Sequence, residues 1–229
     1  MNKQHITVQP TLIVDQLYYD IKERIIQGQL KPDQKLSVRE LCEYYNVSDT
    51  PVKQALNRLV SERFVTSLPR RGMRVRCITK LDIHESIEAR KMVELFAIPF
   101  AISKAASDSR FLRSLESNLE KNEQLLLEMG DLRRYSEKAM EELATSLEFH
   151  RLFVGCIDNS IILESYHNIV NHQYVYYQHQ KDKSRALMAS LNEHKQIFNC
   201  LKAGDEAALT ASILHHLTVR EQDATSAID

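Results

Sequence analysis

Two short helices separated by only two residues constrain this chain more than any other feature. Ser37 and Glu40 form a Ser-x-x-Glu capping box, which marks a helix start because each side chain satisfies the other residue's free backbone amide. That helix is predicted to end near Asn46, and Ser48 can cap the next one. The apolar stripe of this next helix consists of Val52, Ala55, Leu56, Leu59 and Val60. Two helices joined by so tight a turn predict a helix-turn-helix.

The flanking segments extend this motif to a winged helix over residues 10–78, after a tail at 1–9. Apolar residues recur every four positions from Leu12 to Gln27, which predicts a preceding helix that stops at Gly28. Residues 64–66 and 73–77 are predicted to be strands, and residues 68–72 connect them with Arg70, Arg71 and Gly72. A hairpin that carries arginines can contact a DNA groove or phosphates beside the recognition helix.

The third helix carries polar side chains away from its apolar stripe, among them Thr50 and Lys53, and an acid, Asp49, in its first turn. A negative charge suits a helix N-terminus because the helix dipole is positive there. Asp49 cannot pair with a phosphate, but its carboxylate can accept from the amino group of cytosine. Two interpretations stay open: Asp49 only caps the helix while other residues read bases, or it reads cytosine.

Charge is distributed unevenly along the chain. Residues 1–80 hold 14 Lys and Arg against 8 Asp and Glu, whereas the remainder holds 16 against 23, so the net charge of −1 conceals a basic and an acidic part. This asymmetry favours a DNA-facing domain joined to an acidic one.

Residues 12–76 resemble the winged helix of the GntR family of bacterial transcription regulators. The matching motifs are Gly28-x-Leu30-x-Pro32, Lys35-Leu36-Ser37, Val47-Ser48-x-Thr50-Pro51-Val52-Lys53-x-Ala55-Leu56, Arg58-Leu59 and the wing Gly72. The resemblance implies DNA contacts by Arg39, Ser48, Thr50 and Lys53 and by the wing tip around Gly72. Asp49 and Lys53 stand where the family commonly has Arg, and Arg63 replaces the usual Gly after the third helix.

The remainder, residues 79–229, is predicted to be an all-α bundle of six helices. Asp82 can cap the first helix, which Pro99 is expected to bend. Further helical patterns cover residues 110–128, 132–156, 160–180, 184–202 and 205–224, with no strand pattern between them. A unit of about 150 residues can bury its own core.

Three histidines on separate predicted helices are candidate metal ligands: His150, His194 and His216. Neutral imidazoles that converge from facing helices of a bundle can hold Zn²⁺, Ni²⁺ or a similar ion. Their separations of 44 and 22 residues do not by themselves establish such a site.

This second part resembles the FCD effector domain of the FadR-type branch of GntR regulators, at the length of VanR-like members. The matching motifs are Arg90-x3-Glu94, Phe149-His150, Asn159, Glu193-His194-x2-Ile197, Gly204-Asp205-x-Ala207 and His216-Leu217. The resemblance implies a divalent metal held by the three histidines and an Asp four residues before the first, with a small organic acid bound over it. Ser146 stands at the Asp position, and a Ser hydroxyl is a poor ligand at neutral pH. Ser146 and Arg90 are assigned to the effector pocket.

Two kinds of effector site stay open at this point. Three histidines with water make an acceptable open metal site. Alternatively, the histidines of a metal-free pocket hydrogen-bond a carboxylate effector directly.

These features together predict a metabolite-responsive transcription regulator, more a repressor than an activator, and not an enzyme. The expected partners are a pseudo-palindromic site on duplex DNA, a small organic acid and a second copy of the chain. No apolar run reaches the roughly 18 residues that span a bilayer, and the start lacks the layout of a signal peptide, so we expect a cytoplasmic protein with no membrane partner.

Two rivals come from other classes of protein. A zinc hydrolase could use the three histidines, but Glu148, the nearest acid, points to a different helix face from His150. An adaptor whose helix-turn-helix docks protein is the second rival, and the basic wing argues against it.

Overall fold

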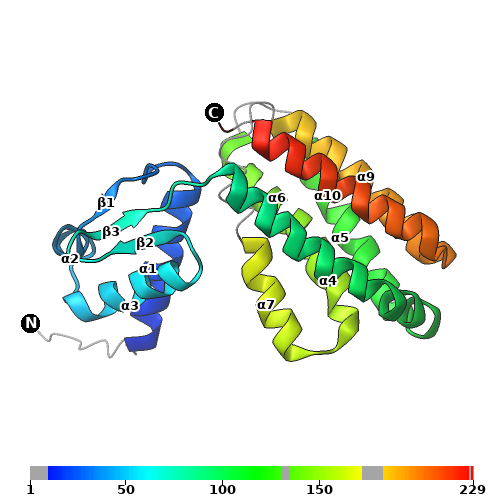
Figure 1. The fold of residues 1–229 in the computed structure, drawn as a ribbon, viewed down its shortest axis with the longest axis horizontal. Helices are drawn as coiled ribbons and strands as arrows, with labels where there is room; N and C mark the ends of the chain where they lie inside the picture. The colour runs from blue at the N-terminus through cyan, green and yellow to red at the C-terminus, as the bar shows by residue number, and fades with distance from the viewer. Residues whose placement is uncertain (1–9, 130–134, 172–182, 227, 229) are drawn as a thin grey trace, which may run out of the picture. The chain divides into compact units, whose positions relative to one another are not determined.

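The computed structural model describes residues 10–129, 135–171, 183–226 and 228, and the chain divides into two compact units (Figure 1). The first unit is Met1–Ile78 and the second is Thr79–Asp229. The predicted tail at residues 1–9 lies outside the described residues. None of the helices in the described ranges combines the length and the apolar character needed to cross a bilayer.

The first unit combines three helices with a small antiparallel sheet. Its elements are α1 (Pro10–Ile26), β1 (Lys35–Leu36), α2 (Val38–Tyr45), α3 (Asp49–Ser61), β2 (Val65–Leu68) and β3 (Gly72–Val75). The strand order is β1-β3-β2, with Lys35 opposite Arg74 and Val65 opposite Val75. The predicted winged helix-turn-helix is confirmed, and β1 is an addition to the two predicted strands. A strand of two residues is too short to show alternation in the sequence.

The core of this unit comes from the periodic positions of α1 and α3. Ile21 and Ile25 of α1 and Leu56 and Leu59 of α3 are at most 2% exposed, and each contributes about 1.5–3 kcal/mol by leaving water. Helix α1 packs across α3. This packing holds α3 in place with its polar face outward.

The turn between α2 and α3 depends on one left-handed residue. Asn46 has φ 52°, and the amide of Val47 donates to the carbonyl of Cys42 at 3.1 Å, which closes α2. Ser37 caps α2 as predicted, since its side chain accepts from the amide of Glu40, but the reciprocal bond from the Ser37 amide to the Glu40 side chain is absent among the described residues, so only half of the predicted capping box forms. The predicted cap of α3 differs, because Ser48 holds the N-cap position without a side-chain hydrogen bond.

The second unit is all-α in its described residues, which confirms the predicted fold class. Its helices are α4 (Lys80–Ser107), α5 (Ser109–Glu128), α6 (Tyr135–Val154), η1 (Gly155–Ile157), α7 (Ser160–Asn171), α9 (Lys183–Ala203) and α10 (Glu206–Ser226). The predicted break at Gly130-Asp131 and the second half of the 160–180 helix lie outside the described residues.

Helix α4 packs against α6, α7 and α10 within this bundle. Thr79 caps it, with Asp82 as the reciprocal partner at the third position, so the predicted cap by Asp82 itself is wrong by three residues. Helices α9 and α10 lie side by side as a hairpin (Figure 1), and Gly204 with φ 68° ends α9. This arrangement turns one face of each of α4, α6, α9 and α10 toward a common interior.

Candidate functional site

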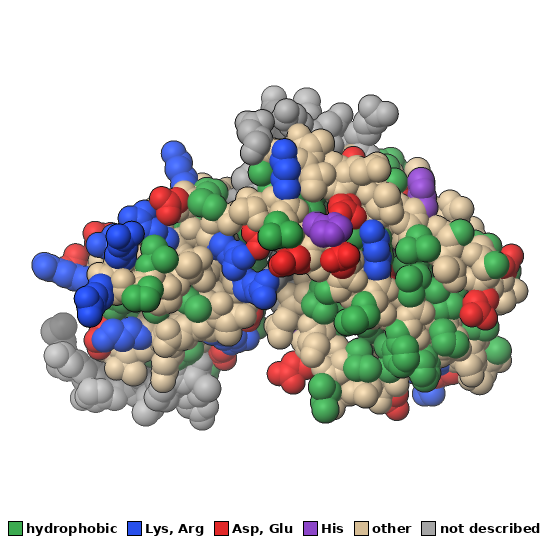
Figure 2. All heavy atoms as spheres, viewed as in Figure 1, with side chains coloured by type: hydrophobic (Ala, Val, Ile, Leu, Met, Phe, Trp, Pro, Cys, Tyr) green, Lys and Arg blue, Asp and Glu red, His purple; other side chains and the backbone are tan. Residues whose placement is uncertain are grey.

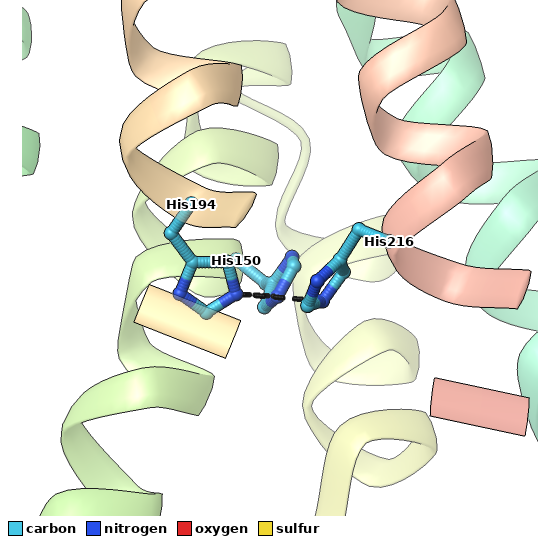
Figure 3. Close-up of side chains that lie close together, drawn as sticks. All are labelled: His150, His194 and His216. Carbon is cyan, nitrogen blue, oxygen red and sulfur yellow. Dashed lines mark hydrogen bonds between the residues drawn. The ribbon is translucent and has the colours of Figure 1, made fainter. Parts of the chain in front are cut away.

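The three histidines meet in that interior (Figure 3). His150 comes from α6, His194 from α9 and His216 from α10, and they are 3%, 1% and 1% exposed. His194 Nε2 lies 2.9 Å from His150 Nε2 and 3.4 Å from His216 Nε2. One ligand atom from each ring lies within 4.8 Å of the others. The three side chains therefore direct ring nitrogens at one small volume.

Two carboxylates contact the Nδ1 atoms of two of the three rings. Glu94 Oε2 is 3.0 Å from His150 Nδ1, and Glu193 Oε2 is 2.7 Å from His216 Nδ1. Because a carboxylate accepts, Nδ1 of each ring donates, and each Nε2 is left with a lone pair. His194 can offer a proton from Nε2 to only one of them. At least one lone pair in the centre is therefore without a proton from the three rings.

Burial keeps these imidazoles neutral. It lowers the pKa of His194 and of His216 well below the usual 6.5, and the nearby Arg90 and Arg220 guanidinium groups lower both pKa values further. The pKa of His150 is also lowered by burial, although Glu94 acts against the shift. Neutral imidazoles are the form that binds metal ions.

The donor set fits a divalent ion. Nitrogen ligands 2.0–2.1 Å from a tetrahedral Zn²⁺ lie about 3.3 Å from one another, close to the 2.9 and 3.4 Å that separate His194 Nε2 from the other two rings. Three imidazoles leave a fourth position open. Ser146, one turn before His150 on α6, is 7% exposed, but it brings no charge to the centre.

A buried charge network supports the His150 side of the centre. Arg90 Nε donates to Glu94 Oε1 at 2.8 Å, and the Tyr166 hydroxyl donates to the same oxygen at 2.6 Å. Burial alone would raise the pKa of Glu94, but Arg90 and His150 lower it to about 2. Arg90 is fully buried, yet its Nη1 and Nη2 atoms have no hydrogen-bond partner in the described part of the chain. Two guanidinium nitrogens in this state are suited to receive a carboxylate.

The sequence pattern alone predicts no role in the site for Glu193 or Glu94. Glu193 directly precedes His194, but it contacts His216 on the next helix and also lies 3.5 Å from Arg220. Adjacent residues point about 100° apart around a helix. Only the packing of α9 against α10 brings Glu193 and His216 together.

The sequence-predicted DNA contacts on α2 and α3 are all at the surface of the first unit. Ser48, Thr50 and Lys53 are exposed around the start of α3. Lys53 Nζ lies 2.6 Å from the carboxylate of Asp49, and this contact lowers the pKa of Asp49. Arg39 on α2 is similarly paired with Glu43 at 3.0 Å, with 89% of its side chain exposed.

The tip of the wing presents two arginines at the surface. Arg70 and Arg71 in the turn between β2 and β3 and Gly72 at the start of β3 are exposed, and the two arginines form no ion pair with any described residue. Gly72 has φ 84°, which a side chain would strain. Arg74 on β3 differs, because its guanidinium pairs with Asp33 at 3.1 Å. Figure 2 shows Lys and Arg side chains over much of the visible face of this unit.

Comparison with known proteins agrees with this geometry. Residues 13–75 match the family described as "Bacterial regulatory proteins, gntR family", and residues 85–219 match the FCD domain. The chain is 23% identical over 210 residues to the uncharacterized HTH-type transcriptional regulator YdhC of Bacillus subtilis (strain 168), covering 90% of this chain and 88% of that one. It is 25% identical over 200 residues to the gluconate operon transcriptional repressor of the same organism, covering 85% and 78%.

Among solved structures, a putative GntR transcriptional regulator from Rhodococcus sp. RHA1 has the same fold. Its TM-score is 0.76 at 21% identity, over 94% of this chain and 99% of that one. The winged helix and the helical domain thus define a DNA-binding transcription regulator rather than an enzyme. The chain belongs to the GntR family, in its FCD branch. This membership excludes the hydrolase that the three histidines alone would have allowed.

Proposed function

We propose that the protein is a cytoplasmic repressor whose binding to DNA is weakened or altered when a small organic acid binds the helical unit. The observation that carries the proposal is the convergence of three buried, neutral histidines beside an arginine with two unpaired nitrogens. Such a centre can take a positive ion at the histidine nitrogens and an anion at the arginine.

Duplex DNA is the macromolecular partner in this proposal. Thr50 and Lys53 of α3 approach base edges with Ser48 at the helix start, and Arg39 and the wing residues Arg70, Arg71 and Gly72 contact phosphates or a neighbouring groove. Asp49 acts mainly through Lys53 and the helix terminus. Because one short helix reads few base pairs, two copies address a pseudo-palindromic site.

His150, His194 and His216 are the proposed ligands of a divalent ion such as Zn²⁺ or Ni²⁺. When bound, the ion supplies positive charge in a buried place and so attracts an anionic effector. Glu94 and Glu193 hold two of the imidazoles in the tautomer that binds metal. Ser146 is buried one turn before His150 on α6, at the position where a carboxylate would be a fourth ligand.

Arg90 is the proposed anchor for the effector's carboxylate, through its Nη1 and Nη2 atoms. The name of the gluconate operon repressor of Bacillus subtilis concerns an operon for an organic acid, which is in keeping with this class of ligand. Binding would shift the population between states that match and mismatch the two half-sites on DNA.

Calorimetric titration of Zn²⁺ and Ni²⁺ into chelator-treated protein tests the centre. We expect binding by the wild type, loss of binding in His194→Ala, and tighter binding in Ser146→Asp, which adds a carboxylate on the face of His150. Equal binding by wild type and His194→Ala would show that these histidines are not a metal site.

A metal-free centre is the second candidate, because the 2.9 Å between His150 and His194 is also the length of an N–H···N hydrogen bond. In that case the histidines and Arg90 bind the effector's carboxylate directly. The same titration separates the two candidates.

A further inference from the structure

Two buried acceptor atoms on the seam between α5 and α6 have no hydrogen-bond partner among the described residues. They are Oε2 of Glu142 and Oδ1 of Asn118, and no other buried side-chain acceptor in the described ranges is left in this state. Glu142 is fully buried, whereas Asn118 is buried at this oxygen and partly exposed elsewhere. A buried acceptor without a donor costs free energy, so the pair points to a group that binds there.

Neighbouring contacts fix both oxygens on the same seam. Asn118 Nδ2 donates to the carbonyl of Thr145 at 3.0 Å, and Asn122 Nδ2 donates to Glu142 Oε1 at 3.2 Å. Asn118 and Asn122 are one turn apart on α5, and Glu142 and Thr145 are one turn apart on α6. The two bonds are therefore adjacent links between the helices, and the two unpaired oxygens belong to neighbouring positions.

The Glu142 carboxylate has no basic side chain of the described residues to compensate it. It forms no ion pair within the described ranges, and burial raises its pKa to about 7 although Asn122 donates to it. A cation that reached Oε2 would stabilise the ionised carboxylate, because an opposite charge favours the charged form of a buried group.

The unpaired atoms also indicate what kind of group fits. Both are acceptors, so a group that only donates suits them better than one that also accepts. An ammonium carries three donors, no acceptor and a positive charge. It can donate to Glu142 and Asn118 together, and its bond to the carboxylate is charge-assisted. A hydroxyl offers one donor and no charge.

Arg90 has the opposite requirement. Its Nη1 and Nη2 atoms are buried donors without a partner in the described part of the chain. Arg90 contacts Glu94, which in turn contacts His150 on α6. Glu142 lies two turns before His150 on the same helix, which is about 12 Å along the helix axis, and the small side chain of Ser146 is buried between them. Unpaired donors and unpaired acceptors thus lie roughly two helical turns apart in one unit.

We infer that the helical unit binds a zwitterion, an acid with an ammonium group at the far end of a chain of about five or six carbons. Arg90 receives its carboxylate, and Glu142 with Asn118 receives its ammonium. A chain of this length, together with the reach of the two charged side chains, spans the distance of about 12 Å. The inference rests on the proposed effector site and narrows its ligand from organic acids to ω-amino acids.

Calorimetric titration of ε-aminocaproate into the full chain tests this assignment, with caproate and adipate as probes of the same length that lack the ammonium. The titration is made at about pH 8, where most Glu142 carboxyl groups are ionised. We expect ε-aminocaproate to bind at least about 10-fold more tightly than either probe. Caproate leaves the two acceptors unpaired, and adipate brings a second negative charge toward Glu142.

Glu142→Gln removes the charge and keeps the shape of the side chain. It should weaken ε-aminocaproate at least about 10-fold and change caproate by less than about two-fold, so that the preference for the ammonium is lost. Glu141→Gln is the matched control, since Glu141 is the adjacent acid, its side chain is 53% exposed and it pairs with Lys121 at 3.3 Å. It should bind all three probes like wild type.

The outcomes separate this inference from the proposed function. Caproate that binds as tightly as ε-aminocaproate, or a preference for ε-aminocaproate that persists in Glu142→Gln, overturns the zwitterion and leaves an organic-acid effector standing. A protonated Glu142 that only donates to Asn118 would give the first of these results. Absence of binding by all three probes also overturns the zwitterion, while the metal titration of the histidines decides the proposed centre separately.

Discussion

Helices α3 and α4 each carry an acid and a base one turn apart, but the pair on α3 is exposed to solvent and the pair on α4 is buried. Asp49 and Lys53 of α3 are 2.6 Å apart with more than half of each side chain exposed. Arg90 and Glu94 of α4 are 2.8 Å apart and at most 1% exposed. The same spacing and chemistry thus produce a replaceable surface contact in one unit and a fixed part of the core in the other.

The difference follows from water. An exposed pair is screened and contributes little, so Lys53 can exchange Asp49 for a phosphate at small cost. A buried pair has lost its hydration, and removing one member leaves the other charge without compensation. The exposed pair suits a surface that binds and releases DNA, whereas the buried one suits a scaffold that holds His150 in place.

The largest effect is expected when the buried pair is broken. Arg90→Met should destabilise the helical unit by about 3–5 kcal/mol because Glu94 would remain buried without its partner. Lys53→Met on α3 should change stability by less than about 0.5 kcal/mol. Urea unfolding followed by circular dichroism measures both, and equal effects would abolish the contrast between the two helices.

A buried acid that has no basic partner in the described part of the chain extends the comparison between exposed and buried charges. Glu142 on α6 is fully buried, its Oε2 has no partner among the described residues, and burial raises its pKa to about 7 although Asn122 donates to it. Because the folded pKa is above the usual 4.5, stability should fall as pH rises from about 4.5 to 7 and then level off.

The corresponding variant is Glu142→Gln, which keeps the shape and removes the ionisation. It should be more stable than wild type at pH 8 by up to about 3 kcal/mol, with little difference at pH 4.5. Unfolding measured at both pH values checks the sign. A variant that is less stable at pH 8 would mean that the ionised carboxylate is compensated in the fold.

Removing the charge of a carboxylate that contacts a proposed metal ligand should have an intermediate effect. Glu193→Gln should weaken Zn²⁺ or Ni²⁺ binding about 10- to 100-fold, because the charge that orients His216 is lost. Glu123→Gln is the control, since Glu123 is an exposed acid paired with Lys195 at 2.7 Å on the surface. If the two variants bind the ion with the same affinity in calorimetry, Glu193 does not support the centre.

The smallest effect is expected at the exposed pair of α3. Asp49→Asn should free Lys53 and raise affinity for duplex DNA a few-fold at low salt, with the salt dependence steeper by about one phosphate contact. Arg70→Ala with Arg71→Ala should weaken binding across all sequences. Fluorescence anisotropy over a salt series measures both, and weaker binding by Asp49→Asn would point to direct reading of cytosine by Asp49.

The sequence by itself determined the elements that depend on near neighbours. Caps, turns and apolar periods involve residues a few positions apart, so the helix-turn-helix between Ser37 and Val60 and the all-α second unit could be predicted. Even there, β1 and the cap at Thr79 were missed, because a two-residue strand and a choice between Thr79 and Asp82 leave little local signal.

Only the tertiary structure decided which distant groups meet. Three histidines could be nominated from the sequence, but the distances between their nitrogens, the tautomers that Glu94 and Glu193 impose and the unpaired nitrogens of Arg90 depend on how α4, α6, α9 and α10 pack. The same holds for α4, whose apolar residues look alike in sequence until packing buries Val93 and leaves Phe96 exposed. Burial and long-range contact are set by the whole core, and no local pattern encodes them.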